Sequence, residues 1–248
     1  MQEYRDILHQ EMPAQHFEAA SFAVLDFQNH KWRGIHYRSP HLQDVQYFDL
    51  ASLTKPLSLG LCFLVHPELW ETKQFAWLLN HRACLPVGGR LSKDDWKEHV
   101  KRFIPVLSDG DVYSDFSPLR LQLEIQEKIG KHLYDIVSPF WSQQILSWLE
   151  LGDNRELCPP TGTRRGETIR GEVHDDNAYV IGEKLSHAGL FATLEGVCET
   201  LLKMDRELHL LDEMDAHFTE GEKEGRRFVR GWDTVSDPQN TLAGEGCG

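Results

Sequence analysis

The chain has 248 residues, of which 40% are hydrophobic, 26% charged and 10% aromatic, enough for one large or two small domains with a buried core. Its 19 glycines and 11 prolines exclude a collagen-like or low-complexity chain. The formal net charge of −13 repels phosphate backbones and anionic membrane surfaces, so we expect neither nucleic acid nor a membrane as partner.

The N-terminal region predicts a helix followed by a hairpin. Apolar residues at helical spacing in the first dozen positions predict a short helix that ends before Pro13. The apolar run 20–27 predicts a strand, the polar residues 28–31 a turn, and residues 32–37 a second strand. We therefore predict an antiparallel hairpin over residues 20–37, which needs further strands or helices over its face to be stable.

The rest of the chain has a mainly helical pattern. It predicts helices over residues 52–65, 94–103, 117–129, 133–149 and 194–210, whereas strand signals are scarce. We predict an α+β fold in one domain over 1–248, with the hairpin and first helix start in 17–56, a mainly helical region in 57–210 and a loop-rich end in 211–248. The charged run 220–230 is predicted to be a solvated loop or helix end.

The sharpest chemical signal is Ser52, followed three residues later by Lys55 in the segment FDLASLTK. At the start of a helix this S-x-x-K spacing puts both side chains on one face. A serine hydroxyl becomes a good nucleophile when a neighbouring base takes its proton, and an enclosed amine one turn away can act as that base. Ser52 is the candidate nucleophile and Lys55 its candidate base. The bare pattern is common, so a structural Ser and Lys pair is the alternative.

A second signal is the segment Tyr113-Ser114-Asp115, which follows a turn-like SDGD sequence and immediately precedes a predicted helix. A tyrosine placed beside a serine and a lysine can relay a proton between them and a leaving group. Tyr113 is therefore the third candidate catalytic residue.

With these two motifs the chain resembles the serine beta-lactamases, penicillin-binding proteins and related esterases, most closely the class C and esterase-like branch. The motifs of that family are S-x-x-K, Y-x-N or Y-S-[ND], and a K-T-G or H-T-G strand. Segments 78–86, 113–130, 171–178 and 186–193 also look like parts of this family, and the resemblance runs from about residue 17 to 234. It implies a beta-lactamase/transpeptidase-like fold, in which a helical domain packs against an antiparallel sheet.

The sequence departs from the family pattern in two places. Residues 80–84, NHRAC, stand where relatives usually carry T-H-T-S-G, so a loop near the site entrance is altered. The third motif is absent, because residues 228–233, FVRGWD, look like the stretch before it and the sequence stops a few residues later. We therefore expect a sheet that lacks its C-terminal strands, whose exposed edge favours self-association. By the resemblance, the missing strand would carry one oxyanion donor, a loss of about 10²- to 10³-fold in rate.

Two weaker patterns lie between residues 171 and 193. The segment HAG at 187–189 is a poor substitute for the third motif, because the residues after it match the family's stretch before that strand. The segment HDD at 174–176, with His187, offers metal ligands at unspecific spacing, and Asx-type turns are the stronger interpretation. Since the family's corresponding loop lies near the cleft, we expect His174, Asn177 and His187 to line the substrate pocket, together with Asp115 of the second motif.

Several kinds of site and location are not indicated. No nucleotide-binding glycine motif is present, and we expect no metal and no cofactor. The five scattered cysteines form no C-x-x-C pair and are predicted to be free and mostly buried thiols. The longest apolar stretch, 57–65, is far below the roughly 20 residues of a membrane span, and the polar start is not followed by an apolar segment, so we expect a soluble, cytoplasmic protein.

Two hypotheses of function follow. The first is a serine hydrolase that forms an acyl ester on Ser52 and acts on a small ester or amide, as an esterase, beta-lactamase or D,D-peptidase would. The second is a catalytically incomplete relative that acts as a non-enzymatic binding module.

Overall fold

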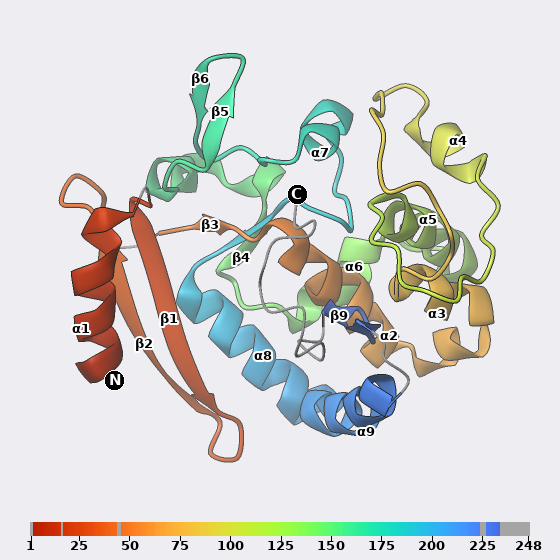
Figure 1. The fold of residues 1–248 in the computed structure, drawn as a ribbon, viewed down its shortest axis with the longest axis horizontal. Coiled ribbons are helices and arrows are strands. Elements are labelled where there is room, and N and C mark those ends of the chain that lie inside the picture. Colours follow the sequence, from red (N-terminus) through yellow and green to blue (C-terminus); the bar gives the residue numbers. More distant parts are fainter. Residues whose placement is uncertain (1, 16, 44–45, 224–226, 234–248) are drawn as a thin grey trace.

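A β-hairpin lies at one end of the molecule and a group of helices at the other, with short strands between them (Figure 1). The computed structural model describes residues 2–15, 17–43, 46–223 and 227–233. Helices and small antiparallel sheets, joined by loops, form this part of the chain, which confirms the predicted α+β class.

The N-terminal hairpin consists of β1 (Ala19–Asp26) and β2 (Lys31–Arg38), paired antiparallel. Its turn is held by Asp26, whose Oδ1 accepts the backbone N–H of Asn29 at 3.0 Å. Helix α1 (Gln2–Glu11) packs on β2, and α8 (Leu194–Leu208) packs against β1, as Figure 1 shows. The predicted hairpin is confirmed, and the two helices supply the cover that an isolated hairpin lacks.

The helical part is built from short segments. The α-helices are α2 (Leu61–Val65), α3 (Lys73–Leu79), α4 (Trp96–Lys101), α5 (Phe116–Ile129), α6 (Leu133–Val137), α7 (Asp176–Ile181) and α9 (Leu210–Lys223). Pro56–Gly60 is a π-helix, and the 3₁₀ segments are Met12–Ala14, Ala51–Leu53, Pro67–Glu71, Ser138–Phe140, Trp148–Glu150 and Gly152–Leu157. The predictions for 94–103, 117–129 and 194–210 are confirmed with shifted ends, and the predicted helix 52–65 is continuous but changes type along its length.

A small sheet lies between the hairpin and the helices. Its strands are β3 (Phe48–Asp49), β7 (Leu190–Ala192) and β4 (Ile145–Ser147), in the antiparallel order β3-β7-β4. The predicted helix over 133–149 is wrong, because β4 occupies its second half. Pro139 explains the break, since proline has no N–H for the helix ladder and disfavours helical backbone in the residue before it.

The remaining strands form two-stranded sheets. They are β5 (Gly162–Arg164) with β6 (Glu167–Ile169), and β8 (Phe228–Val229) with β9 (Trp232–Asp233). Strands of two or three residues carry too little alternation to be recognised by their pattern, which explains why the sequence indicated so few. The charged run 220–230 covers the end of α9 and the start of β8, and residues 224–226 lie outside the described part.

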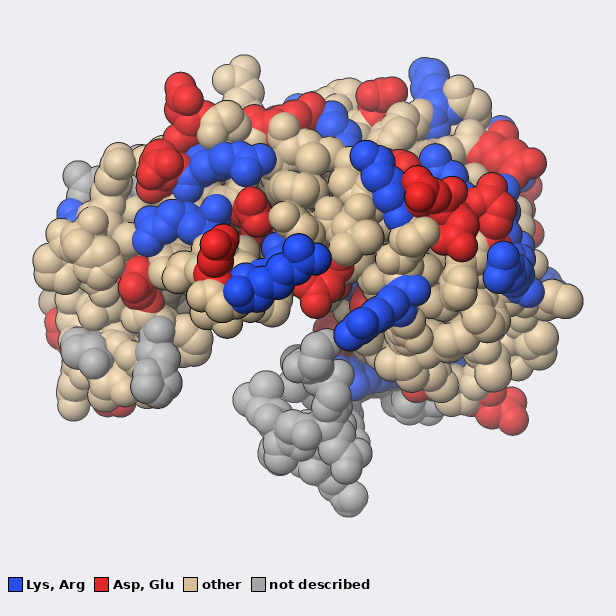
Figure 2. Space-filling model, turned by 90° about the horizontal axis from the view of Figure 1, so that it is seen from above, with Lys and Arg blue, Asp and Glu red and all other residues tan. Residues whose placement is uncertain are grey.

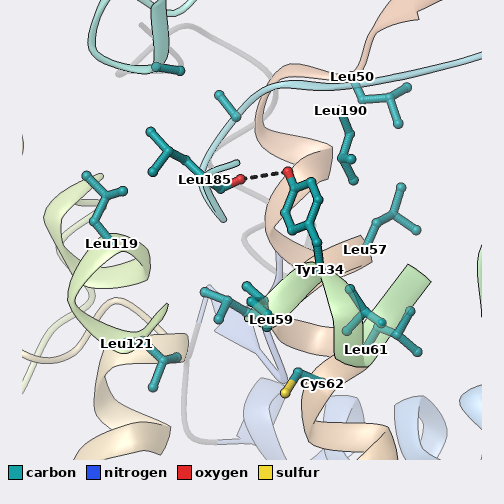
Figure 3. Close-up of a cluster of buried hydrophobic side chains, with 14 of the residues drawn as sticks. Leu50, Leu57, Leu59, Leu61, Cys62, Leu119, Leu121, Tyr134, Leu185 and Leu190 are labelled. Atoms are coloured by element: carbon teal, nitrogen blue, oxygen red, sulfur yellow. Dashed lines mark hydrogen bonds between the residues drawn. The ribbon is translucent and has the colours of Figure 1, made fainter. Parts of the chain in front are cut away.

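The core is one cluster of buried hydrophobic side chains that extends from Tyr47 to Leu210. Figure 3 shows part of it, with Leu57, Leu59 and Leu61 near Tyr134 of α6, and with Leu119 and Leu121 of α5 on the left of the view. The Tyr134 hydroxyl donates a hydrogen bond of 2.9 Å to the Leu185 carbonyl, and burial raises the pKa of Tyr134. Each fully buried leucine contributes about 1.5–3 kcal/mol, so this cluster fixes the segment that carries Lys55.

Charged side chains of both signs lie on the surface (Figure 2), and the described cysteines are free thiols. On the face seen in Figure 2, Lys and Arg lie among Asp and Glu rather than apart from them.

Of the described cysteines, all free, Cys62, Cys158 and Cys198 are buried and Cys84 is exposed, whereas Cys247 lies outside the described residues. Within the described ranges no helix combines the length and the apolar character needed to cross a membrane.

Candidate active site

Ser52 lies in the single 3₁₀ turn Ala51–Leu53, which begins two residues after the last residue of β3. Asp49, the last residue of that strand, accepts the Ala51 N–H through Oδ1 and the His174 N–H through Oδ2, each at 2.8 Å. Ala51 has a φ of 45°, a left-handed conformation that L residues adopt rarely. Burial raises the pKa of Asp49, while its two backbone hydrogen bonds act in the opposite direction. The Asp49 carboxyl thus ties the turn that presents Ser52 to a neighbouring loop.

Ser52, Lys55 and Tyr113 meet in a triangle of short contacts. Lys55 Nζ donates to Ser52 Oγ at 2.9 Å and to the Tyr113 hydroxyl at 2.6 Å. The Ser52 and Tyr113 hydroxyl oxygens are 2.6 Å apart. Ser52 is exposed, whereas Lys55 is 6% exposed. The arrangement therefore offers an accessible hydroxyl to solvent with an enclosed amine and a phenol behind it.

Contacts of Ser114 and His81 hold Tyr113 in place just before α5. The Ser114 hydroxyl donates to the Pro86 carbonyl at 2.5 Å and accepts the Phe116 N–H at 3.1 Å, at the start of that helix. The Ser114 N–H in turn donates to Nδ1 of His81 at 3.2 Å, and the His81 ring lies 4.5 Å from the Tyr113 ring, centre to centre. Burial, followed by the charge of Lys55, lowers the pKa of His81 to about 3. His81 is therefore a neutral support for Tyr113.

Asp115 is a further partner of Lys55. Its Oδ1 lies 3.0 Å from Lys55 Nζ, and its side chain is 29% exposed. Its N–H donates to the Val87 carbonyl at 3.1 Å, which attaches the segment to the loop before α4. Asp115 thus lies at the open side of the site, with its carboxylate beside the amine.

His187 also contacts Lys55, through its backbone. Its carbonyl accepts a hydrogen bond from Lys55 Nζ at 3.3 Å. Its ring is 1% exposed, and Nε2 lies 3.0 Å from Asp175 Oδ1. Burial alone would raise the pKa of Asp175, but the hydrogen bond and charge of His187 lower it to about 2. The Nε2 atom of this buried imidazole thus has Asp175 as its partner.

Comparison with known proteins gives matches among solved structures. Neither a protein-family model nor a curated protein matches the chain. A class C beta-lactamase from Rhodobacter sphaeroides superimposes with a TM-score of 0.57 at 10% identity, over 81% of this chain and 63% of that protein. An octameric penicillin-binding protein homologue from Pyrococcus abyssi gives 0.61 at 12%, over 88% and 60%. The D-amino acid amidase from Ochrobactrum anthropi SV3 gives 0.52 at 14%, over 79% and 68%.

The chain has the fold of the serine beta-lactamases and penicillin-binding proteins. This confirms the fold that the S-x-x-K and Tyr-Ser-Asp motifs implied. The chain spans less than two thirds of the length of the beta-lactamase and the penicillin-binding protein homologue that it matches.

In this beta-lactamase fold, two further predicted pocket residues bind neighbouring loops. His174 is exposed and donates its backbone N–H to Asp49. The Asn177 side chain accepts the Leu91 N–H at 2.9 Å and donates to the Gly89 carbonyl at 2.8 Å. Asn177 therefore fastens the loop 88–91 to α7, and the amide has both of its polar atoms engaged.

The segment 187–189 leads into the middle strand of the small sheet. Gly189 has a φ of 110°, and its carbonyl accepts the Trp148 N–H at 2.9 Å. The next residue, Leu190, begins β7, which pairs with strands on both sides. The segment 187–189 thus has a structural role, because it leads into the central strand of the small sheet.

The 174–176 segment makes contacts of its own. Asp175 Oδ1 accepts the Ala178 N–H at 2.7 Å and so caps α7, and Asp176 Oδ1 accepts from Arg164 Nε at 3.0 Å. Among the residues that the structure describes, no group of three or more His, Cys, Asp or Glu side chains is placed to hold a metal ion.

Sequence reasoning missed the supporting roles of Asp49, His81 and Asp175. Asp49 is two residues before the Ala51 N–H that it binds, a spacing typical of Asx turns, so this signal was available. The role of His81 depends on Ser114 and that of Asp175 on His187. These contacts join distant segments, so no local spacing indicated them.

Proposed function

We propose that the protein is a serine hydrolase that cleaves small esters or amides through an acyl ester of Ser52. The observation that carries this proposal is the triangle of Ser52, Lys55 and Tyr113, in which an exposed hydroxyl contacts an enclosed amine and a phenol. The beta-lactamase fold supports it, since the matched structures include a beta-lactamase and an amidase.

The chemistry divides into two acyl transfers. In the first, Lys55 Nζ in its neutral form accepts the Ser52 proton while Oγ attacks the substrate carbonyl, and the tetrahedral adduct then expels its alcohol or amine. Tyr113, within 2.6 Å of both Lys55 Nζ and Ser52 Oγ, passes the proton to that leaving group. In the second, water attacks the acyl ester, releases the acid and returns the proton to Ser52.

The negative charge that develops on the carbonyl oxygen requires hydrogen-bond donors. The backbone N–H of Ser52 is one candidate, because it moves with the nucleophile. A second donor is worth about 10²- to 10³-fold in rate. We expect the rate to depend on whether such a donor is present, and the binding module of the second hypothesis is the alternative if no acyl ester forms.

The first test is covalent labelling. The folded 248-residue chain is incubated with a fluorophosphonate and, separately, with a penicillin, and intact-protein mass spectrometry follows the mass. We expect one adduct on the wild type, none on Ser52→Ala, and labelling of Lys55→Ala slower by about 10²- to 10⁴-fold, the usual contribution of a positioned base. Circular dichroism checks that the variants are folded.

Two outcomes contradict this assignment. An adduct that survives in Ser52→Ala would place the nucleophile elsewhere. A folded wild type that forms no adduct with either reagent would favour the non-enzymatic alternative.

A further inference from the structure

The Asp115 carboxylate has capacity for a ligand in addition to Lys55. Oδ1 contacts Lys55 Nζ at 3.0 Å, and 29% of the side chain is exposed. Among the described residues, Lys55 is the one side chain that forms an ion pair or hydrogen bond with this carboxylate. An ionised carboxylate offers about four lone-pair positions on its two oxygens. A substrate at the open side of the site therefore meets an acceptor that the protein has not saturated.

The chemistry of a carboxylate restricts what can bind there. It accepts hydrogen bonds and donates none, whereas an asparagine amide at the same place offers both a donor and an acceptor. A substrate carbonyl facing Asp115 would point its negative oxygen at the negative carboxylate and be repelled. An ammonium group would instead form a charge-assisted hydrogen bond with the carboxylate. Asp115 thus favours a cationic donor on the substrate.

The nucleophile lies within reach of such a substrate. Ser52 Oγ is 2.9 Å and Asp115 Oδ1 is 3.0 Å from the same Lys55 Nζ. The hydroxyl and the carboxylate are therefore no more than two hydrogen-bond lengths apart, roughly 6 Å. An amine on the carbon next to the scissile carbonyl can contact Asp115 while Ser52 attacks that carbonyl.

Three residues next to members of the site have exposed apolar side chains. Leu53, next to the nucleophile, is 51% exposed, and Val112, next to Tyr113, is 37% exposed. Val87, whose carbonyl accepts the Asp115 N–H, is 66% exposed. Apolar side chains that are exposed at positions adjoining Ser52, Tyr113 and Asp115 favour a substrate with an apolar side chain.

We propose that Asp115 binds the protonated amine of the substrate, and that the substrates are amides or esters of apolar amino acids with a free α-amine. This inference rests on the proposed function of Ser52. The pairing of Asp115 with Lys55 and the position of both beside Ser52 carry it.

The test compares two substrates that differ in the amine alone. Phenylalanine p-nitroanilide and its N-acetyl derivative, each as the D and the L enantiomer, are assayed at pH 6, where the free amine is protonated. The readout is the ratio of kcat/KM for the free amine to that for the acetylated form. Because both substrates use the same Ser52 and Lys55, any general effect of a variant on those residues cancels in the ratio.

We expect the wild type to prefer the free amine, and Asp115→Asn to lower the ratio by about ten- to a hundredfold, as for a lost hydrogen bond to a charged group. Asp109→Asn is the matched control, because it removes a carboxylate from an exposed position of the preceding turn, and it should leave the ratio within about twofold. An unchanged ratio in Asp115→Asn, a wild-type preference for the acetylated form, or hydrolysis of neither anilide by a labelled enzyme would each overturn the proposal.

Fluorophosphonate labelling of the same samples separates this inference from the proposed function. The reagent carries no amine, so its reaction with Ser52 does not require amine binding by Asp115. A wild type that is not labelled contradicts the proposed function. A labelled wild type without an amine preference contradicts the role of Asp115 alone.

Discussion

His81 illustrates how a buried titratable group at the site affects stability. Burial and the charge of Lys55 lower the pKa of its imidazole to about 3, whereas a histidine in the unfolded chain titrates near 6.5. Between these values the unfolded chain binds more protons than the folded protein. The free energy of unfolding therefore falls as the pH is lowered from 6.5 towards 3.

This linkage predicts the behaviour of His81→Gln. The glutamine oxygen can accept the Ser114 N–H as His81 Nδ1 does, but it does not titrate. Between pH 7 and pH 5 the wild type should lose about 2 kcal/mol more stability than the variant, measured by urea unfolding at both pH values. His9→Gln, on the exposed face of α1, should resemble the wild type. If His81→Gln were as sensitive to acid as the wild type, His81 would not be the group that takes up the proton.

The local residues of the site were the most predictable. Ser52 and Lys55 share a helix face because they are three positions apart, and the contact of 2.9 Å between Oγ and Nζ follows from that spacing. Asp115 precedes α5, as its position before a helical pattern indicated. The sequence did not reveal that Asp115 contacts Lys55, because this pairing joins segments that are distant along the chain.

At the scale of the elements, the close approach of α8 to the backbone before β4 depends on Gly196. Thr193 caps the helix by accepting the Gly196 N–H at 3.0 Å. A Cβ at position 196 would lie 2.9 Å from the carbonyl oxygen of Gln144, which belongs to the backbone and cannot rotate away. The glycine therefore sets the distance between the helix and the small sheet.

We predict that Gly196→Ala destabilises the protein by about 1–3 kcal/mol, as overpacking does. Helix propensity alone favours the opposite change, since alanine is better than glycine by about 1 kcal/mol within a helix. The sign of the change in urea midpoint decides between the two effects. Gly88→Ala is the control, because an added Cβ there meets nothing within 4 Å. A stabilised Gly196→Ala would show that the approach of α8 is not tight.

The hairpin and the segment 133–149 show where element prediction succeeds and fails. In the hairpin, alternation and a polar turn lie in one continuous stretch, so the sequence indicated β1 and β2 directly. In 133–149 apolar residues at helical spacing suggested one helix. Pairing of β4 with β7, whose residues lie far along the chain, competes with that local preference and wins in the second half.

At the scale of the molecule, the core cluster from Tyr47 to Leu210 links the small sheet to the helices. Since a single core unfolds as a unit, we predict one cooperative transition, as expected for the one domain predicted over 1–248. Tryptophan fluorescence and far-ultraviolet circular dichroism should give coincident urea curves. A separate early transition in either signal would show that the hairpin, with α1, unfolds independently of the helices.

The sequence by itself determined the features that depend on neighbours along the chain: the hairpin, several helices, the S-x-x-K pair and the Tyr-Ser-Asp segment before α5. The tertiary structure decided which of these segments meet. It brought Tyr113 to Ser52, Asp115 to Lys55 and Asp175 to the His187 ring. A local sequence pattern indicates the preferred backbone conformation and which face of an element is buried. The contacts between distant segments result instead from the packing of the whole core, and no short stretch of sequence carries that information.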